Sequence, residues 1–266
     1  MNKDCAVTAG ASATLGRLRQ AVAKIEGQET DLGIAVRALT FGVPAIDASL
    51  QGGLAPAGLH EIAPASARDL GAAVGFAFAL AARVAGDGRS TLWIQTDFAA
   101  LEAGHVYGPG CDLFGLPASR LLIVKVVRPL DALWAMEEAL KCGALACVIA
   151  ELPKDGAIAD LTATRRLTLA AREGGGFGFL LRHRPSSLAS SAETRWQVAA
   201  AASRPDAFGG LGRTAFALAL TKNRRGPAGL WTIAWNHHER SFQALSLGVA
   251  EMAFDRPDRM PIARAG

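Results

Sequence analysis

GLHEIAPASARDLGAAVGFAFALAARVAG, residues 58–86, is the stretch of sequence that decides the fold. A short apolar run containing Leu59 and Ile62 leads into a turn of small residues at 63–67, and a long apolar segment follows over residues 70–84. A strand, a turn and a buried helix in this order form the frame in which nucleotide-binding proteins hold a phosphate at the helix N-terminus. We therefore expect a strand–turn–helix unit here.

The residues of this turn lack the chemistry of a phosphate-binding loop. Such a loop, G-x-x-x-x-G-K-[ST], turns backbone N–H groups toward the phosphates and adds a lysine and a magnesium-binding hydroxyl. We align Ala63 with the first glycine of this pattern. The positions of the second glycine, the lysine and the hydroxyl residue then hold Arg68, Asp69 and Leu70. Asp69 would repel a phosphate, and Leu70 cannot ligate a metal.

Ser66 and Asp69 give the helix start another role. Their spacing is that of a capping box, with aspartate in place of the commoner glutamate or glutamine. Ser66 can accept a hydrogen bond from an N–H of the first turn, and the Asp69 carboxylate favours the positive end of the helix dipole. The free N–H groups at the start of the helix can thus be paired within the protein, without a bound anion. An ordinary buried strand–helix unit is therefore the alternative to a nucleotide site.

The composition predicts a protein with a large core and no membrane segment. The chain has 266 residues, of which 50% are hydrophobic and 20% are charged, enough for one large domain or one domain with an appendage. Its apolar runs stay below the roughly 18–20 residues of a membrane span, and the first ten residues lack the order of a signal peptide. Four cysteines without paired spacing indicate reduced thiols in the cytoplasm.

The net charge of +4 is unevenly distributed along the chain. Residues 1–159 carry 13 Lys and Arg against 16 Asp and Glu, while residues 160–266 carry 15 against 8, so the two parts have net charges of −3 and +7. A basic second part suits a polyanion or an acidic protein partner. A solubilising arginine surface is the alternative explanation.

Apolar strands alternate with helices through the middle of the chain. We expect strands over residues 90–96, 120–126, 144–150 and 177–181, helices over 98–106, 130–142 and 158–173, and a turn at Tyr107-Gly-Pro-Gly. The strands are apolar throughout rather than alternating, which is typical of a parallel sheet covered by helices on both faces. The fold class is therefore α/β with a mostly parallel sheet. Residues 12–26 add a detached amphipathic helix.

The last third of the chain changes to strands joined by short turns. We expect strands over residues 196–201, 214–221 and 230–235, so that the sheet ends in antiparallel strands. The hairpin tip KNRRGP carries Lys222, Arg224 and Arg225, with Arg213 one strand away. Together with Trp231 and Trp235 on the next strand, these cations could bind phosphates and stack on bases. A soluble hairpin turn with core tryptophans is the alternative.

Few other residues offer catalytic chemistry. Glu151 follows a strand at the place where ATPases of this class hold a magnesium-binding aspartate, although a carboxylate is also a common end to a strand. Asp97 or Glu102 could act as a general base, but without a phosphate site we expect both to be exposed or to cap helices. We read His60 as a hydrogen-bonded residue of the core or of a strand edge. We expect no metal and no cofactor.

Residues 40–62, TFGVPAIDASLQGGLAPAGLHEI, resemble the segment that precedes the phosphate-binding loop in RecA-type recombinases. The family pattern is G-x-x-x-L-D-x-x-L-G-G-G-L-P-x-G-x-x-x-E-I, and it is matched by Asp47, Leu50, Gly52, Gly53, Leu54, Gly58, Glu61 and Ile62. Residues 221–229, TKNRRGPAG, resemble the late RecA segment whose basic residues reach the nucleotide of the neighbouring subunit. Lys222 and Arg224 occupy those positions. The resemblance implies a RecA-like core.

The chain departs from the RecA pattern in several places, and with these departures it resembles a narrower family. The phosphate-binding loop is lost, Glu151 stands at the magnesium position, and the two DNA-binding loops shrink to about residues 154–160 and 183–194. A RecA-like chain of this size with these losses is similar to the ImuA family, whose members are SOS-induced RecA homologues without ATPase activity. The family acts with ImuB, an inactive Y-family polymerase homologue, and an alternative DNA polymerase III α subunit in error-prone translesion synthesis.

We therefore expect a non-catalytic, cytoplasmic, RecA-like accessory protein of SOS-induced mutagenesis. The resemblance implies an ImuB-like protein and an alternative polymerase III α subunit as partners, with RecA and DNA as further candidates. We expect an N-terminal helical arm over residues 1–36, a core domain over 37–240 and a C-terminal tail over 241–266. Two alternatives stay open, a divergent ATP-binding ATPase that uses Arg68 and Glu151, and a SulA-like inhibitor of cell division.

Overall fold

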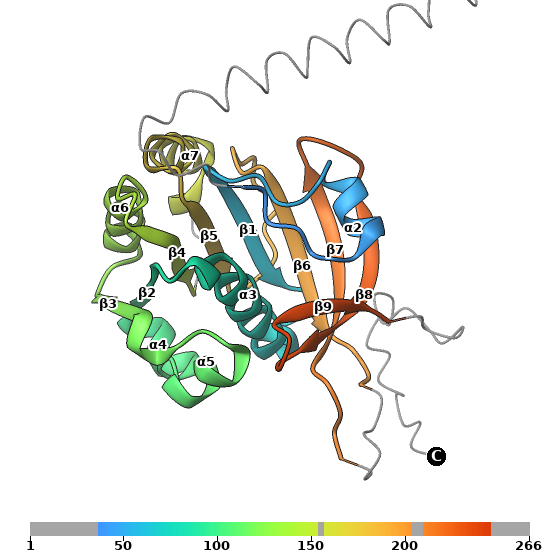
Figure 1. Ribbon diagram of the computed structural model, residues 1–266. Helices are drawn as coiled ribbons and strands as arrows, with labels where there is room; N and C mark the ends of the chain where they lie inside the picture. The colour runs from blue at the N-terminus through green and yellow to red at the C-terminus, as the bar shows by residue number, and fades with distance from the viewer. Residues whose placement is uncertain (1–36, 154–156, 204–209, 246–266) are drawn as a thin grey trace, which may run out of the picture. The chain divides into compact units, whose positions relative to one another are not determined.

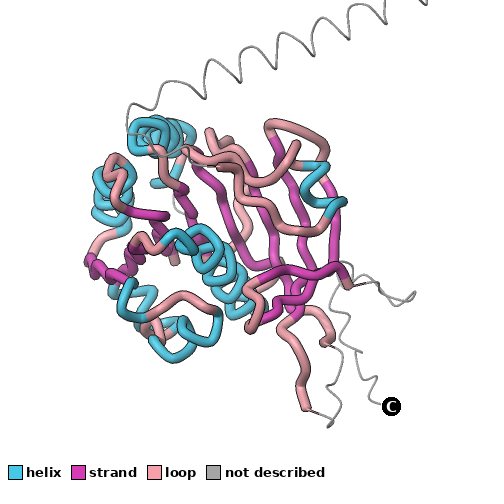
Figure 2. Tube along the Cα trace, in the orientation of Figure 1, coloured by secondary structure: helices cyan, strands magenta, loops and turns pink. Residues whose placement is uncertain are grey.

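The computed structural model describes residues 37–153, 157–203 and 210–245, and within them nine strands form a single sheet (Figures 1 and 2). The strands follow the order β3-β2-β4-β5-β1-β6-β7-β8-β9. The amphipathic helix expected over residues 12–26 lies outside the described residues, as does most of the expected tail. Within those ranges, every helix is too short or too polar to cross a bilayer.

The sheet is parallel on one side and antiparallel on the other. Its strands are β1 Gly58–Pro64, β2 Ser90–Thr96, β3 Leu121–Val126, β4 Leu145–Leu152, β5 Phe177–Arg182, β6 Thr194–Ala200, β7 Ala215–Asn223, β8 Gly229–Asn236 and β9 Ser241–Ala244. The strands from β3 to β6 pair in parallel, and those from β6 to β9 pair antiparallel. The expected fold class is confirmed. We expected the core to end at residue 240, but β9 extends the sheet past it.

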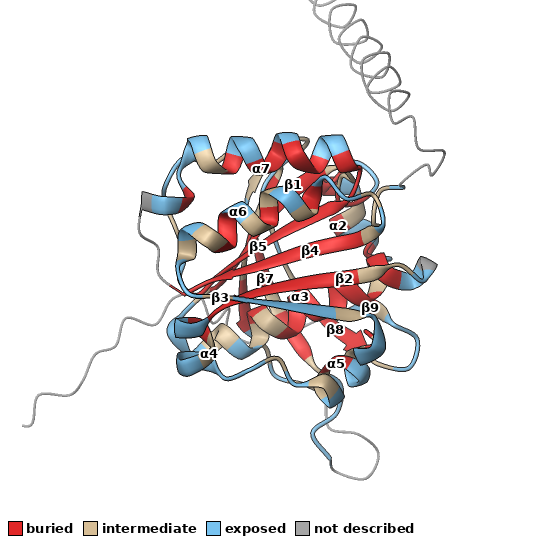
Figure 3. Ribbon diagram, turned by 90° about the vertical axis from the view of Figure 1, so that its left-hand side faces the viewer, coloured by how far each residue is buried: buried red, intermediate tan, exposed pale blue. Residues whose placement is uncertain are grey.

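Helices cover both faces of the parallel part. They are α3 Leu70–Val84, α4 Asp97–Ala103, α5 Gly108–Phe114, α6 Pro129–Leu140 and α7 Leu161–Gly174, whereas α2 Pro44–Ser49 lies against β8 of the antiparallel part. Figure 3 shows α6 and α7 on one side of the sheet and α3, α4 and α5 on the other. Parallel strands need such crossover helices, which explains the alternation of strands and helices along the chain.

The segment after β2 differs from its expected form. We expected one helix over residues 98–106 and a turn at Tyr107-Gly-Pro-Gly, but α4 ends at Ala103 and a second helix, α5, begins at Gly108. Tyr107 is the N-cap of α5, and Pro109 lies in its first turn. Proline is tolerated at the start of a helix because the first N–H groups have no partner within the helix.

The helix α3 has the bounds that the sequence predicts, Leu70–Val84. Its face toward the sheet carries Phe76, which packs near Phe41, Trp196 and Phe242 with ring centroids 5.9–6.2 Å apart. Most of the helix is buried. Helix α3 is apolar around nearly its whole circumference because it is buried around most of it.

A second core lies between the sheet and the pair α6–α7. Leu133, Met136 and Leu140 of α6 are buried there against residues of the sheet and of α7. The two helices meet at their C-terminal ends, because Gly174 has no side chain. A Cβ at this position would come within 2.0 Å of the carbonyl oxygen of Leu140.

Strand β3 forms an open edge of the sheet. Its sequence is as apolar as that of the buried strands, yet Leu122, Ile123 and Val124 are all exposed. Lys125, also exposed, is the kind of charged residue that keeps edge strands from pairing with other chains.

Candidate functional site

The turn between β1 and α3 is closed by its own side chains. Ser66 donates hydrogen bonds from its N–H (3.1 Å) and its hydroxyl (2.6 Å) to Asp69 Oδ2, and the capping box forms. Asp69 Oδ1 accepts from the N–H of Ala200 at the end of β6 (3.0 Å). Ala63 is buried within β1 and Arg68 is exposed. At the position of the phosphate-binding lysine there is thus a carboxylate that binds the protein's own donors.

Glu151 lies near the end of β4, buried among protein donors. Its Oε2 atom accepts hydrogen bonds from Trp93 Nε1 (3.2 Å) and Gln95 Nε2 (2.9 Å) of β2. Its Oε1 atom lies 2.7 Å from Nε2 of His183, which follows β5. A buried carboxylate is tolerated when such donors surround it. The arrangement stabilises the charge within the fold and directs both oxygens toward the protein.

The Glu151 network extends to the loops on either side. Gln95 Nε2 also donates to the carbonyl of Gly104 (3.0 Å), and His183 Nδ1 lies 4.0 Å from Glu102 Oε2. The end of helix α4, which follows β2, and the loop after β5 are therefore joined across the end of β4, which lies between these strands. Glu102 and Asp97 are both exposed, as we expected.

A second buried network surrounds Glu61 of β1. Arg182 Nη2 of β5 lies 3.1 Å from Glu61 Oε1, and Arg195 Nε of β6 lies 2.5 Å from Oε2. Burial raises the pKa of the Glu61 carboxyl, but the charge of Arg182 and the hydrogen bond and charge of Arg195 outweigh that effect and lower it. Glu61 thus stays ionised and ties the three neighbouring strands together.

Basic side chains also hold the loop between β5 and β6. Arg195 donates to the carbonyl oxygens of Ser186 (2.9 Å) and Leu188 (2.8 Å), and Lys222 Nζ donates to that of Ser190. Burial, followed by the charge of the nearby Arg224, lowers the pKa of Lys222. Lys222, which we expected to be free for a partner, is therefore part of the scaffold of this loop.

Arg225 lies on the hairpin tip, as expected, but it binds the end of α2, and Arg213 lies far from the tip. Arg225 Nη2 donates to the carbonyl oxygens of Leu50 (2.8 Å) and Gln51 (3.2 Å) at the end of α2. Arg213 precedes β7, whereas Lys222 lies near its other end, which at about 3.3 Å per residue separates them by roughly 30 Å. Arg213 therefore does not join the cations of the hairpin tip.

Arg224 is the cation of the tip that remains on the surface. Its Nη1 atom lies 3.8 Å from Oε1 of Glu193, and Nη2 of Arg172 in α7 approaches the same oxygen at 3.7 Å. Both arginine side chains are about half exposed, whereas Glu193 is mostly buried. Two cations thus share one carboxylate, and their outer faces leave a positive surface between α7 and the tip.

The tryptophans of β8 do not form the expected stacking surface. Trp235 is fully buried and packs against Phe242 at a centroid distance of 4.8 Å. Trp231 is half-buried and lies 6.2 Å from Trp196. The prediction that both rings could stack on bases beside the tip is contradicted at Trp235, and the alternative of core tryptophans fits it.

His60 is a buried, hydrogen-bonded residue, as expected. Its Nδ1 atom lies 2.8 Å from Thr194 Oγ1 and its Nε2 atom lies 3.0 Å from the carbonyl oxygen of Ala55. Burial lowers the pKa of His60 to about 4, and the charge of Arg225 acts in the same direction. The ring is therefore neutral at pH 7 and links β1 to β6.

Sequence reasoning selected Glu151 and missed the residues that surround it. A signal was present, because Gln95 and Arg182 are polar residues near the ends of apolar strands. The sequence did not show that these ends meet beside Glu151 and Glu61. Among the residues that the structure describes, no group of three or more His, Cys, Asp or Glu side chains could hold a metal ion.

Known proteins resemble this chain in sequence and in fold. No family model matches it. "Protein ImuA" from each of two strains of Caulobacter vibrioides is 31% identical to it over 210 residues, which cover 73% of this chain and 82% of the relative. The crystal structure of the RadB recombinase superposes with a TM-score of 0.54 at 14% identity, and covers 78% of this chain and 100% of that chain. The RecA-like fold is thereby confirmed.

Proposed function

The chain belongs to the ImuA family, and on this basis we propose that it is a RecA-like accessory protein of SOS-induced, error-prone translesion DNA synthesis that works without hydrolysing ATP. The fold supplies a rigid scaffold for such a role. Its surface, rather than the ends of its parallel strands, then carries the function.

The observation that supports this proposal most directly is the environment of Glu151. An ATPase of this fold needs a carboxylate that is open to magnesium and a loop that is open to phosphates. Here three donors, from Trp93, Gln95 and His183, surround the carboxylate. The neighbouring loop holds Asp69 where the phosphate-binding lysine would be. Binding a nucleotide would require both networks to break.

Equilibrium binding of fluorescent ATP to the full chain tests the proposal. We expect no saturable binding with or without magnesium, and no release of phosphate above a buffer blank. A RecA-type ATPase with an intact phosphate-binding loop provides a positive control. Micromolar, magnesium-dependent binding that is lost in Glu151→Gln would favour the divergent ATPase instead.

We propose that the protein partners are an ImuB-like polymerase homologue and an alternative DNA polymerase III α subunit. The surface formed by Arg172 and Arg224 around Glu193 supports a contact with an acidic partner. Each arginine is about half exposed and shares its counter-ion with the other. Because two arginines share the single charge of Glu193, one positive charge is left over, which a partner carboxylate can neutralise.

A further inference from the structure

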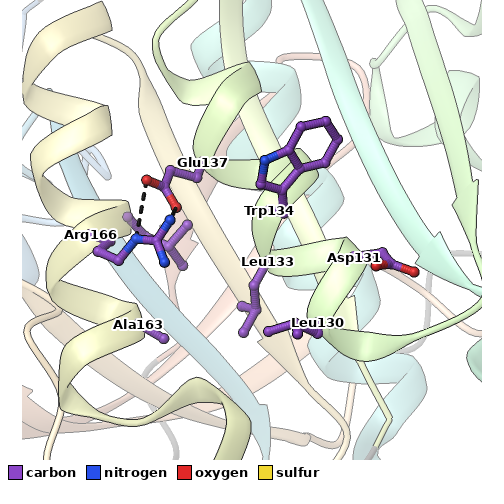
Figure 4. Close-up of a pocket in the computed structure, with 8 residues that line it drawn as sticks. Leu130, Asp131, Leu133, Trp134, Glu137, Ala163 and Arg166 are labelled. Atoms are coloured by element: carbon purple, nitrogen blue, oxygen red, sulfur yellow. Dashed lines mark hydrogen bonds and ion pairs between the residues drawn. The ribbon is translucent and has the colours of Figure 1, made fainter.

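A groove of about 310 Å³ lies between α6 and α7, on the face of the sheet opposite α3 (Figures 3 and 4). Leu133 and Leu167, both buried, are the deepest of the residues that line it. Trp134 and Leu130 line it from α6, and Ala163 lines it from α7. The groove occupies the first turns of the two helices, because Gly174 brings their other ends into contact.

The apolar side chains at the rim of this groove are unusually exposed. Trp134 is 64% exposed and Leu130 is 61% exposed, whereas Trp93, Trp196 and Trp235 are all fully buried. A large apolar side chain of this kind beside a cavity is typical of a surface that binds a protein segment. The groove can hold one or two bulky side chains.

Each end of the groove carries an ion pair whose cation faces outward. At one end Arg128 binds Asp131 at 2.7 Å, and the side chains are 72% and 35% exposed. At the other end Arg166 binds Glu137 at 2.7 Å, and the side chains are 62% and 17% exposed. In both pairs the arginine is the more exposed partner. The apolar groove is therefore flanked at both ends by accessible guanidinium groups.

These features select one type of occupant. A stable dimer of this chain would bury about 1,200 Å² or more, much more than a groove for one or two side chains offers. A nucleic acid backbone would lay its charged phosphates over the apolar floor, which offers them no counter-charge. A short segment with apolar residues between acidic residues matches both the floor and the flanks.

We propose that the α6–α7 groove binds a short acidic segment of a partner protein through one or two bulky apolar residues. The apolar residues lie between Trp134 and Ala163, and the flanking carboxylates pair with Arg128 and Arg166. Arg128, the N-cap of α6, and Glu137, which binds Arg166, are about 13 Å apart along the helix at 1.5 Å per residue, which an extended segment spans with about four residues. This proposal does not depend on ATP or on the Arg172–Arg224 surface.

The test uses the full chain and the fluorescein-labelled peptide Asp-Glu-Leu-Phe-Asp-Glu, with fluorescence anisotropy as the readout. We expect saturable binding that weakens at high salt. Trp134→Ala should weaken binding at least about tenfold, and Arg128→Ala and Arg166→Gln should each weaken it about fivefold. Trp134→Phe should retain most of the affinity, because it keeps an apolar ring at the rim.

The matched control is Arg165→Gln, since Arg165 is an exposed arginine of α7 that does not line the groove. The Kd of this variant for the peptide should stay within about twofold of the Kd of the unchanged protein. The proposal is overturned if the peptide does not bind, if a peptide with serine in place of Leu and Phe binds equally well, or if Trp134→Ala has no effect. Trp134-dependent dimerisation in sedimentation, or Trp134-dependent binding of a single-stranded oligonucleotide, would also overturn it.

Discussion

His183 Nε2 lies 2.7 Å from Glu151 Oε1, so a residue that follows β5 closes the end of β4. In a RecA-type ATPase this place belongs to a metal ion. Here the histidine, together with donors from Trp93 and Gln95, keeps a buried carboxylate in place. The same carboxylate position has thus become an element of stability, and this can be measured.

Glu151→Ala should destabilise the protein strongly, because it leaves the ring N–H groups of Trp93 and His183, and one of the two N–H groups of the Gln95 amide, without an acceptor. We expect a loss of about 3 kcal/mol or more in the free energy of unfolding, and about 1–2 kcal/mol for Glu151→Gln, which keeps one acceptor. Urea unfolding followed by circular dichroism measures both. Glu138→Ala, which removes an exposed ion pair with Lys141, serves as the control and should leave the midpoint unchanged. Equal midpoints for all three variants would contradict the structural role of Glu151.

The Glu61 network should make stability depend on acid pH. The pKa of Glu61 is lower in the folded protein than its ordinary value of 4.5. Its contribution is therefore fully present above about pH 4.5 and is lost as the pH falls below that value. Glu61→Gln should cost about 3–5 kcal/mol at pH 7, because Arg182 and Arg195 lose their partner. The fall in stability below pH 4.5 should be shallower in this variant. Parallel urea titrations between pH 7 and 3 would show it, and identical slopes would argue against the prediction.

His60 should cause a separate decrease in the free energy of unfolding, at higher pH than the decrease caused by Glu61. Its pKa falls from 6.5 to about 4 on folding, so the unfolded chain takes up a proton before the folded one does. Stability should then decrease as the pH falls from about 6.5 to 4, by roughly 3 kcal/mol in total. An NMR titration of the ring should find no protonation above about pH 5. His238→Ala, a change at an exposed histidine, should leave this step intact.

Restoring the signature of a phosphate-binding loop should not restore ATP hydrolysis. The triple change Arg68→Gly, Asp69→Lys and Leu70→Thr supplies the second glycine, the lysine and the hydroxyl residue, but it leaves Ala63 at the first glycine and Glu151 surrounded by its donors. It also removes the hydrogen bonds of Asp69 to Ser66 and Ala200, which should cost about 1–2 kcal/mol. A malachite green assay for released phosphate tests the variant. Hydrolysis above the blank would show that the site is only dormant.

The surface between α7 and the hairpin tip should contribute to partner binding. Arg172→Ala combined with Arg224→Ala should weaken pull-down of an ImuB-like protein by about tenfold. The melting temperature should fall only modestly, because the mostly buried Glu193 loses both counter-ions but each ion pair is long, at 3.7 and 3.8 Å. Lys222→Ala differs, since it removes a hydrogen bond to the loop at Ser190 and should lower the melting temperature. Arg165→Ala is the control for nonspecific charge. Undiminished pull-down by the double variant would remove this surface from the proposal.

The sequence predicts those elements whose apolar pattern is long and continuous. The bounds of α3 and β2 agree with the sequence, because burial on several sides requires unbroken apolar runs. Helix α5 was missed, because the pair Gly108-Pro109 is as typical of a turn as of a helix start. Strand β9 was missed too, since it is only four residues long.

The candidate site could be predicted only in part. Glu151 was identified from its place after a strand, but its donors come from β2 and from the residue after β5. Long-range pairing of this kind depends on the order of strands in the sheet, which local patterns do not encode. Arg213 is different, because its separation from Lys222 follows from the length of β7 alone, and the strand expected over residues 214–221 already implies it.

The central place of β1 has a consequence for how the molecule acquires its structure. Although β1 is made before every other strand of the sheet, its neighbours are β5 and β6, and Gly58 pairs with Phe177. During synthesis β1 must therefore wait, with its apolar residues and Glu61 unpaired, until the chain has reached Arg195. Such late closure slows folding and lengthens the time during which a nascent chain can aggregate or recruit a chaperone.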